Sequence, residues 1–435
     1  MTSGDRRRTA ADEVAGAACC RRPVRLWGTT VEPGTGELGG RRFLVACKDR
    51  RALLCPACAQ RYQADAFHLV VSGLRGGKGV PASVAGHPAC FLTLTAPSFG
   101  PVHSRPATEK KDAVCRPRRD ASRCAHGVAR SCKVRHEPGD PRLGTALCAR
   151  CFDYEGAVVW NARVSLLWQR TSVLMRRAVA AVGGLTARQQ AEVFRFSYVK
   201  VVEFQRRGLV HLHVVVRADG PEGSGDPPPA WLDGPTLLAG VEEAVARANV
   251  PAPLGESGGT AVVRWGEERT ARVVEGQDHN MVAAYLAKYA VKTATDEAGL
   301  VHRIDGDPGR ALRRADPHTA ALVEAAWRLG ARPELSSLRL RAHAHTFGYG
   351  GHFATKSRLW STTFGALRAA RARHAREAAG ASDDFLEGSF SYLGRGYFSP
   401  EADGLAEVLA EAIATRPRRV PATSPSPSSR GPYGR

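Results

Sequence analysis

Two short motifs bring metal-binding residues and a nucleophile into one 435-residue chain. The first is His211-Leu-His213, which lies inside an apolar run, and the second is Tyr285-Leu-Ala-Lys-Tyr289. A pair of imidazoles can hold a divalent cation, and a phenol oxygen can attack a phosphodiester to form a phosphotyrosine ester. Together the two motifs indicate metal-assisted cleavage of a DNA strand.

The two histidines are expected on a β-strand, where alternate side chains share a face. Alternating apolar runs on either side of Gln-Arg-Arg-Gly predict a hairpin. If residues 206–208 form a three-residue loop, Glu203 falls directly opposite His211, on the same face as His213. A two-residue turn would shift the register by one residue and send Glu203 to the other face.

A cluster of Glu203, His211 and His213 leaves coordination positions open for water or phosphate oxygens, and Mg²⁺ or Mn²⁺ suits such a substrate. Two other interpretations stay open on the residues alone. The histidines can be structural residues of a sheet, or the triad can belong to a non-haem iron oxygenase.

The tyrosine motif has the spacing of a helix with one polar stripe. Tyr285, Lys288, Tyr289 and Lys292 stand at positions i, i+3, i+4 and i+7, so two phenols and two ammonium groups share a surface. A lysine beside the reacting phenol can stabilise the phenolate or the transition state. The alternative is an ordinary helix whose tyrosines cover the core.

The formal net charge is +20, and the basic residues are spread along the whole chain. Such a surface suits a polyanion, so we expect DNA as the partner, single-stranded and duplex. No stretch approaches the roughly 18 apolar residues that a membrane helix needs, and the basic N-terminus is not followed by an apolar signal segment. The sequence therefore predicts a cytoplasmic protein without a membrane partner.

In that reducing compartment the eleven cysteines are expected to bind one or two structural zinc ions rather than to form disulfides. The first predicted site takes its ligands from four residues: Cys47, Cys55, Cys58 and either Cys20, which we favour, or Cys19. The second joins Cys148 and Cys151 to two of the residues Cys115, Cys124, His126, Cys132 and His136. For this second site we favour Cys124 and Cys132. All-thiolate sites leave no open coordination position, so we expect them to shape the fold or position DNA.

The remaining patterns predict an α+β protein in which helices cover an antiparallel sheet. Helical spacing marks the segments Ala59–Leu74, Gly156–Val182 and Asn280–Thr293. Strand patterns mark Cys90–Ala96, Arg195–Phe204, Leu209–Arg217, Ala261–Trp265 and Arg272–Glu275. From about Arg314 onward the patterns are mainly helical.

Several stretches together resemble the HUH endonucleases, and more narrowly the RepSA-like rolling-circle replication initiators of actinobacterial plasmids. The stretches are Phe91-Leu-Thr-Leu-Thr-Ala-Pro, Val210-His-Leu-His-Val, Tyr285-Leu-Ala-Lys-Tyr, Cys55-Pro-Ala-Cys, Trp160-Asn-Ala and Gly351-His-Phe-Ala-Thr-Lys-Ser-Arg. The similarity extends from about Cys20 to Gly396. The fold that it implies is a five-stranded antiparallel sheet with helices, of the ferredoxin-like or RRM-like kind.

The resemblance implies a nick at a replication origin, a 5′-phosphotyrosine link, a free 3′-OH that primes synthesis, and later rejoining of the strand. Origin DNA is the implied partner, and a host helicase and polymerase are further candidates. Tyr289 is the expected first nucleophile, because related initiators with one tyrosine have Glu at the place of Tyr285, and Tyr285 then serves the second transfer.

The same resemblance makes His211 and His213, with Glu203, the expected catalytic metal ligands. Lys288 is expected to assist catalysis. The residues expected to bind DNA are Lys292, Lys356 and Arg358.

We expect five segments along the chain. They are a disordered N-terminus at 1–18, a zinc-binding module with a helix at 19–88, an HUH endonuclease domain at 89–300 with a zinc-binding insertion at 101–155, a helical DNA-binding region at 301–414, and a disordered tail at 415–435. Two alternative functions remain: a single-strand transposase of the HUH class, and a non-catalytic zinc-dependent DNA-binding regulator.

Overall fold

The protein is described from a computed structural model. The residues that it describes are 9–31, 38–105, 114–253, 260–292, 300, 302–313, 315–378 and 389–415. The chain divides into two compact units: unit 1 contains residues 1–60 and 384–435, and unit 2 contains residues 61–383. Among the described residues, no helix combines the length and the apolar character that a bilayer crossing requires.

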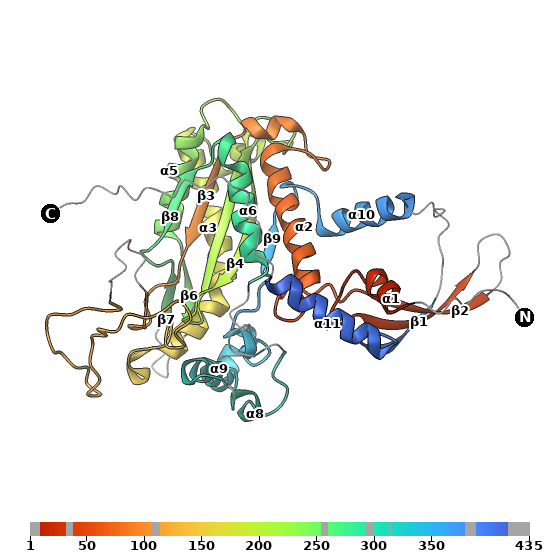
Figure 1. The fold of residues 1–435 in the computed structure, drawn as a ribbon. Coiled ribbons are helices and arrows are strands. Elements are labelled where there is room, and N and C mark those ends of the chain that lie inside the picture. The colour runs from red at the N-terminus through yellow and green to blue at the C-terminus, as the bar shows by residue number, and fades with distance from the viewer. Residues whose placement is uncertain are drawn as a thin grey trace, which may run out of the picture. The chain divides into compact units, whose positions relative to one another are not determined.

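Helices and strands alternate along both units (Figure 1). The helices are α1 (Ala10–Gly16), α2 (Pro56–Arg75), α3 (Tyr154–Val182), α4 (Ala187–Val193), α5 (Gly234–Arg247), α6 (His279–Ala290), α8 (Gly309–Leu312), α9 (Pro317–Leu329), α10 (Phe364–Ala378) and α11 (Pro400–Thr415). The strands are β1 (Val24–Val31), β2 (Leu38–Val45), β3 (Ala89–Leu94), β4 (Arg195–Phe204), β5 (Val210–Asp219), β6 (Asn249–Pro253), β7 (Thr260–Arg264), β8 (Thr270–Val273), β9 (Ala354–Lys356) and β10 (Phe390–Arg395).

Unit 2 is built on a five-stranded antiparallel sheet with the strand order β8-β3-β5-β4-β9. The middle strand, β5, is apolar over most of its length because helices cover both faces of the sheet. This sheet agrees with the predicted α+β class and with the strand number that the resemblance implied.

Each face of the sheet has its own helical cover. On one face, Leu212 and Val214 of β5 pack in a core with α3 and α5. On the other face, Val215 packs with α6, the later part of α2, and Trp360. Figure 1 shows α3 and α6 on opposite sides of the strands. Because side chains alternate, the face toward α6 also receives the odd-numbered residues of β5.

The β4–β5 hairpin has the predicted register, in which Glu203 lies directly opposite His211. The turn is the three-residue loop expected from the sequence. The Gln205 N–H donates to the Leu209 carbonyl at 2.8 Å, and the Gly208 N–H donates to the Gln205 carbonyl at 2.9 Å. Gly208 has a φ of +76°, a left-handed conformation that glycine adopts without steric cost.

A buried asparagine on α3 holds this hairpin in place. The Asn161 Nδ2 donates to the carbonyls of Gly208 and Phe347 at 2.9 and 3.0 Å, and its Oδ1 accepts the Val210 N–H at 3.0 Å. Asn161 is fully buried. One side chain therefore satisfies three buried backbone groups at the start of β5.

Unit 1 contains the three-stranded antiparallel sheet β10-β1-β2 with α1 and α11. Val14 of α1 packs in one core with Tyr397 and Ala406. The Tyr397 hydroxyl donates to the Cys20 carbonyl at 2.7 Å. Segments from the two ends of the chain thus complete one core.

Unit 1 corrects two sequence predictions. The prediction of a disordered segment at 1–18 is wrong for residues 10–16, because Thr9 and Asp12 form a capping box and Val14 is buried. The predicted boundaries at 88 and 300 differ from the observed ones: the N-terminal unit needs residues from beyond 384, and β9 belongs to the central sheet. Residues 416–435 of the predicted tail lie outside the described residues.

Candidate active site

The central hairpin gathers both predicted histidines and Glu203 on the face toward α6. The Nε2 atom of His213 lies 3.3 Å from Glu203 Oε2, and its Nδ1 atom lies 3.4 Å from Thr93 Oγ1 on β3. The His211 and His213 ring centroids are 4.7 Å apart. The strand register, rather than sequence proximity, brings the carboxylate to the imidazole pair.

His211 keeps one ring nitrogen available. Its Nδ1 atom lies 3.1 Å from Gln205 Nε2, whereas its Nε2 atom is buried and has no hydrogen-bond partner in the described part of the chain. Burial lowers the pKa of His211 to about 4, and the neighbouring His213 adds to the effect. The ring is therefore neutral at pH 7, which is the state that a metal ion requires.

Helix α6 presents both predicted tyrosines to this face of the sheet. Its buried residues, Leu286 and Ala290 among them, pack on the sheet, so the neighbouring positions face the imidazoles. The His213 ring centroid lies 4.7 Å from that of Tyr289 and 5.1 Å from that of Tyr285. The two tyrosine rings are themselves 4.7 Å apart.

Lys288 of α6 and Lys292, two residues beyond the end of that helix, bring positive charge close to Tyr289. The Nζ atoms of Lys292 and Lys288 lie 4.8 and 5.7 Å from the centroid of the Tyr289 ring. Lys292 Nζ also lies 3.5 Å from Glu203 Oε1. Lys292, which the sequence suggested as a DNA-binding residue, therefore lies within the candidate site.

The Tyr289 phenol is half-buried, and its burial raises its pKa above the ordinary value. A hydrogen bond with Tyr285 and the negative charge of Glu203 raise the pKa further. The phenol is therefore protonated at neutral pH, so attack by its oxygen requires removal of the proton or a nearby positive charge that favours the phenolate.

The donor set of two imidazoles and one carboxylate fits a divalent cation, and the buried, unpartnered Nε2 of His211 supports this fit. The three residues are not pre-assembled to the same degree as the cysteine and histidine groups of the chain. In those groups, among the described residues, every ligand atom lies within 4.8 Å of the others. A cation at Glu203, His211 and His213 therefore needs side-chain movements that bring the three ligand atoms together.

Two such groups lie in the insertion between β3 and α3. The first contains His103, Cys115, Cys132 and His136. Cys132 Sγ lies 3.6 Å from His136 Nε2, and His136 Nδ1 lies 2.6 Å from Asp140 Oδ2. A metal-ligating histidine usually donates its second ring N–H to a carboxylate, which fixes the orientation of the ring. Asp140 is placed to accept such a hydrogen bond from His136.

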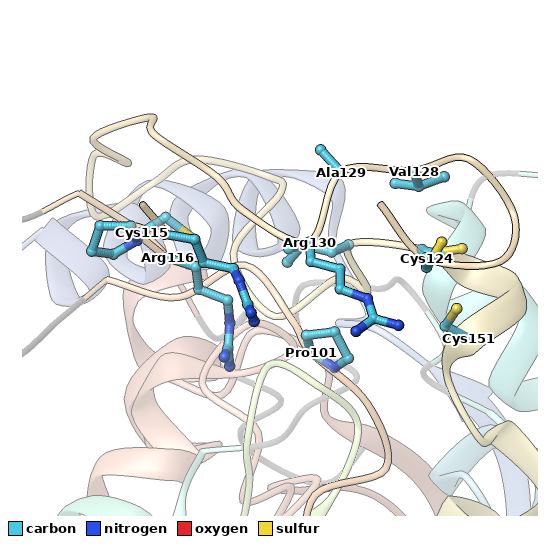
Figure 2. Close-up of a pocket in the computed structure, with 12 residues that line it drawn as sticks. Pro101, Cys115, Arg116, Cys124, Val128, Ala129, Arg130 and Cys151 are labelled. Carbon is cyan, nitrogen blue, oxygen red and sulfur yellow. The ribbon is translucent and has the colours of Figure 1, made fainter. Parts of the chain in front are cut away.

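The second group of the insertion contains Cys124, His126, Cys148 and Cys151. His126 Nδ1 lies 3.2 Å from Cys151 Sγ and 3.8 Å from Cys148 Sγ. Figure 2 shows Cys115 of the first group and Cys124 and Cys151 of the second on opposite sides of a pocket. Each group has four nitrogen or sulfur ligands, the number that structural zinc takes.

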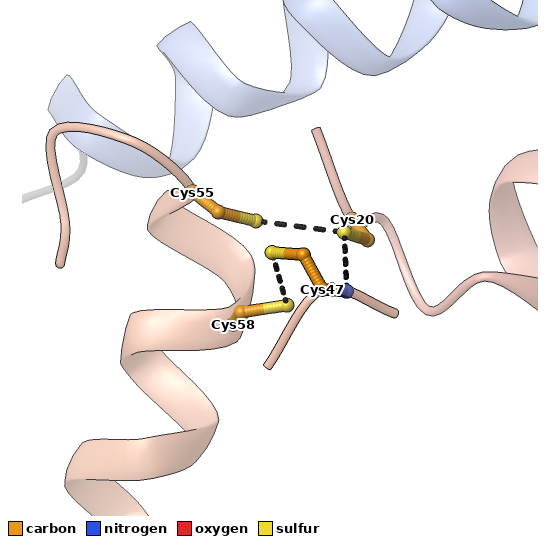
Figure 3. A group of neighbouring side chains, drawn as sticks. All are labelled: Cys20, Cys47, Cys55 and Cys58. Carbon is orange, nitrogen blue, oxygen red and sulfur yellow. Dashed lines mark hydrogen bonds between the residues drawn. The ribbon is translucent and has the colours of Figure 1, made fainter. Parts of the chain in front are cut away.

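The third group lies in unit 1 and consists of Cys20, Cys47, Cys55 and Cys58 (Figure 3). The Sγ atoms of Cys47 and Cys58 are 3.6 Å apart, and those of Cys55 and Cys20 are 3.8 Å apart. The edge of a tetrahedron with Zn–S bonds of about 2.3 Å is about 3.8 Å long. A hydrogen bond with Cys47 is the main cause that lowers the pKa of Cys20, to about 7.

These groups match the first predicted zinc site and correct the second. Cys20, not Cys19, joins the cysteines of unit 1. The prediction that Cys132 joins Cys124, Cys148 and Cys151 is wrong, because Cys132 pairs with Arg116 in a β-bridge beside Cys115. The described residues contain three groups that can hold zinc, whereas the sequence predicted one or two.

A family model described as "RepSA: Replication initiator protein, pSAM2" matches residues 6–411. The chain belongs to the RepSA replication initiator family. A replication initiator protein from Streptomyces ambofaciens is 41% identical over 406 residues, which cover 89% of this chain and 81% of that protein. No solved structure matches the chain.

In this RepSA family member the two other predicted DNA-binding residues lie on strand β9 and in the segment that follows it. Lys356 is on β9, and its Nζ donates to the carbonyls of Ser357 and Arg358 at 3.2 Å. Burial lowers the pKa of Lys356. Arg358 is exposed. The geometry therefore leaves Arg358 as the more accessible of the two cations.

Several residues of the RepSA chain in or beside these sites were absent from the sequence predictions. Thr93 contacts His213, and Gln205 contacts His211. His103 completes a metal-type group. The run Phe91-Leu-Thr93 already belonged to the motifs, so strand alternation was a usable signal for Thr93. His103 had no comparable signal, because its partners Cys115, Cys132 and His136 follow it at irregular intervals.

Proposed function

We propose that this RepSA family protein is a rolling-circle replication initiator of the HUH type that nicks one strand of origin DNA. The observation that supports the proposal most directly is the meeting of the imidazole strand with the tyrosine helix. His213 lies within 4.7 Å of Tyr289, ring centroid to ring centroid, on the face that also holds Glu203. A metal site and a nucleophile therefore face one common space.

In the proposed reaction the Tyr289 oxygen attacks the scissile phosphorus. A P–O bond forms to tyrosine, and the bond from phosphorus to the 3′ oxygen breaks, which leaves a 5′-phosphotyrosine and a free 3′-OH. The phenol proton leaves as the bond forms, and the departing 3′ oxygen takes up a proton. Because the ester retains the bond energy, a 3′-OH can later attack it and rejoin the strand.

The residues around Tyr289 have distinct proposed roles. Lys292 and Lys288 favour the phenolate and the charge of the transition state. His211, His213 and Glu203 would hold Mg²⁺ or Mn²⁺, which withdraws charge from the phosphate oxygens. Tyr285, which is 40% exposed, is accessible for the second transfer. The three cysteine and histidine groups would hold structural zinc.

A covalent-adduct assay tests the proposal. The protein is incubated with Mn²⁺ and single-stranded oligonucleotides that tile both strands of the replicon carrying its gene, and a denaturing gel detects protein–DNA adducts. We expect an adduct with one oligonucleotide, which Tyr289→Phe abolishes and Tyr285→Phe retains. Persistence of the adduct in Tyr289→Phe would move the nucleophile elsewhere.

A second arm of the assay examines the metal ligands. The double variant His211→Ala with His213→Ala should lose the adduct while duplex binding stays largely intact, because phosphate contacts with the positive surface supply most of that affinity. Complete absence of adducts in the wild-type protein would favour a non-catalytic DNA-binding regulator. An adduct confined to transposon ends would favour a transposase.

A further inference from the structure

A pocket of about 640 Å³ lies in the zinc-type insertion of unit 2. Cys115, from one cysteine and histidine group, lies at one end, and Cys124, Cys148 and Cys151, from the other group, lie at the opposite end (Figure 2). Metal binding at both groups would fix the two ends of the pocket. Its volume is in the range of sites that hold small ligands.

Three arginines line this pocket: Arg116, Arg118 and Arg130. Figure 2 shows the side chains of Arg116 and Arg130 extending into the space between the two ends. The Arg116 Nε donates to the Val102 carbonyl at 2.8 Å, which fixes the stem of that side chain. Arg118 is paired with Asp120 at 2.8 Å. Arg116 and Arg130 are thus the cations best placed to meet an anion.

The charge around the pocket is strongly positive. Residues 114–151 contain nine Arg and Lys residues and three Asp and Glu residues. Two of the acids are already engaged, since Asp120 pairs with Arg118, and Asp140 contacts both Arg142 and His136. An anionic ligand therefore meets little competition from carboxylates of this segment.

Apolar residues form the rest of the lining: Pro101, Pro117, Val128, Ala129 and Leu147. An apolar wall beside guanidinium groups matches the two parts of a nucleotide, a flat base and a charged phosphate. A paired base is stacked inside the duplex and exposes only its edges. A concave pocket of this size can receive a base only after the base has left the stack.

We propose that this pocket binds an unpaired nucleotide of single-stranded DNA, with a backbone phosphate on Arg116 and Arg130 and the base against the apolar wall. The inference rests on the proposed function only in taking DNA as the partner. It adds a binding position separate from the candidate nicking site, through which the zinc-type insertion holds the melted strand.

A different role for the arginines makes another prediction. Three thiolates and one imidazole around Zn²⁺ leave one negative charge, which nearby guanidinium groups can neutralise. In that case the loss of Arg116 and Arg130 would weaken metal binding and leave DNA affinity unchanged.

The test is fluorescence anisotropy of the full-length protein with a fluorescein-labelled single-stranded oligonucleotide of mixed sequence. No Mg²⁺ or Mn²⁺ is added, so cleavage does not contribute. The double variant Arg116→Ala with Arg130→Ala is compared with the matched control Arg119→Ala with Arg150→Ala, which removes two exposed arginines that do not line the pocket. Both variants lose the same charge.

We expect the pocket variant to bind about tenfold or more weakly and the control to stay within about twofold of the wild type. Loss of this one phosphate contact should also reduce the slope of log affinity against log salt by about 0.7, the value per contact for single strands. Equal losses in both variants, or reduced zinc content with unchanged DNA affinity, would overturn the proposal.

Two further probes examine the base. An oligonucleotide of equal length built from abasic residues should bind the wild-type protein more weakly, and duplex DNA should compete poorly for the pocket-dependent part of the affinity. Equal binding of the abasic strand, or equal competition by duplex, would refute an unpaired base in the pocket. The adduct assay with Mn²⁺ measures nicking separately, so a failure of either proposal is distinguishable from a failure of the other.

Discussion

A protonated phenol is a poor nucleophile, so the reactivity of Tyr289 depends on how its neighbours change the pKa of the phenol. Burial, Tyr285 and Glu203 all raise its pKa, whereas the ammonium group of Lys292, 4.8 Å from the ring centroid, favours the phenolate. In the proposed reaction, the balance between these groups would set the rate of attack. In the proposed reaction this rate depends on pH through a single proton.

The first prediction concerns that proton. Below the pKa of Tyr289 the phenolate fraction rises with pH, so the single-turnover nicking rate should rise with pH through the neutral range. Lys292→Met raises the pKa further and should lower the rate at pH 7 by about tenfold. Rapid-quench measurements across pH test both points. The matched variant Lys288→Met, with its cation 5.7 Å from the ring centroid, should have a smaller effect, and a reversed order of the two variants would contradict the prediction.

The sequence predicted the spatial neighbours of some site residues and not of others. The position of Glu203 opposite His211 followed from the loop length and from strand alternation, both of which are local rules. His103 and His136 could not be paired in the same way, because a loop-rich insertion has no periodicity that relates distant residues. The partners of a residue on paired strands were therefore predictable, and the partners of a histidine within the irregular insertion were not.

Among the elements, the β4–β5 hairpin has the most direct control over the site, because its register aligns the carboxylate with the imidazoles. Asn161 of α3 anchors the turn and the first residue of β5. A substitution of Asn161 on α3 can thus alter the site, because Asn161 holds the start of β5, the strand of the two histidines.

The second prediction tests that anchor. Asn161→Ala leaves two carbonyls and one N–H buried without partners and should lower the free energy of unfolding by about 3 kcal/mol. Urea unfolding followed by tryptophan fluorescence measures the change. The control Asn280→Ala, at an exposed residue that accepts one hydrogen bond from Arg75, should change stability by less than about 0.5 kcal/mol. Equal effects of the two variants would show that Asn161 is not an anchor.

The third prediction concerns Lys200 of β4, on the sheet face opposite the histidines. It is only 6% exposed, and burial lowers its pKa to about 8. The folded-state pKa is below the ordinary value of 10.5, so the charge destabilises the fold at pH 7 and the penalty disappears as pH rises from about 8 to 10.5. Lys200→Met should therefore stabilise the protein by about 3 kcal/mol at pH 7.

Urea unfolding of Lys200→Met at pH 7 and pH 10 measures this effect, with the exposed Lys133→Met as the control. The gain should shrink at pH 10, where the wild-type amine is largely neutral in the folded state. A gain of the same size at both pH values would mean that improved packing, not removal of a buried charge, is the cause.

At the level of elements, long periodic segments were predicted well. The helix expected at 156–182 spans Tyr154–Val182, and both hairpin strands lie within two residues of their predicted ends. The strand expected at 261–265 corresponds to β7, whereas β1, β2, β6 and α5 were not predicted. β1 and β2 contain Gly and Arg at positions where alternation is expected, and β6 contains two prolines, so the usual strand pattern is interrupted.

On the scale of the whole molecule, the part of the chain that the structure describes contains three metal-type groups. The fourth prediction is a content of three zinc ions per purified chain, measured by plasma mass spectrometry. Because the groups share no ligand, Cys58→Ser and Cys148→Ser should each reduce the content to two, and the double variant to one. A loss of all three ions in a single variant would show that the groups are not independent.

Domain boundaries were the least predictable property of the whole molecule. Composition marked soft segments along the chain but did not reveal that residues 389–415 return to the N-terminal unit. The contact between Tyr397 and Cys20 joins positions that no local pattern relates. Long-range pairings of this kind follow from packing, and a single sequence contains little record of them.

The pairing of segments from the two ends of the chain in unit 1 also has a consequence for biosynthesis. β1 pairs with β10, and α1 packs with α11, so a ribosome must finish nearly the entire message before the first sixty residues can find their partners. Products of premature termination lack that half of the unit. Only complete translation products can therefore assemble the amino-terminal module, which couples its formation to the integrity of the transcript.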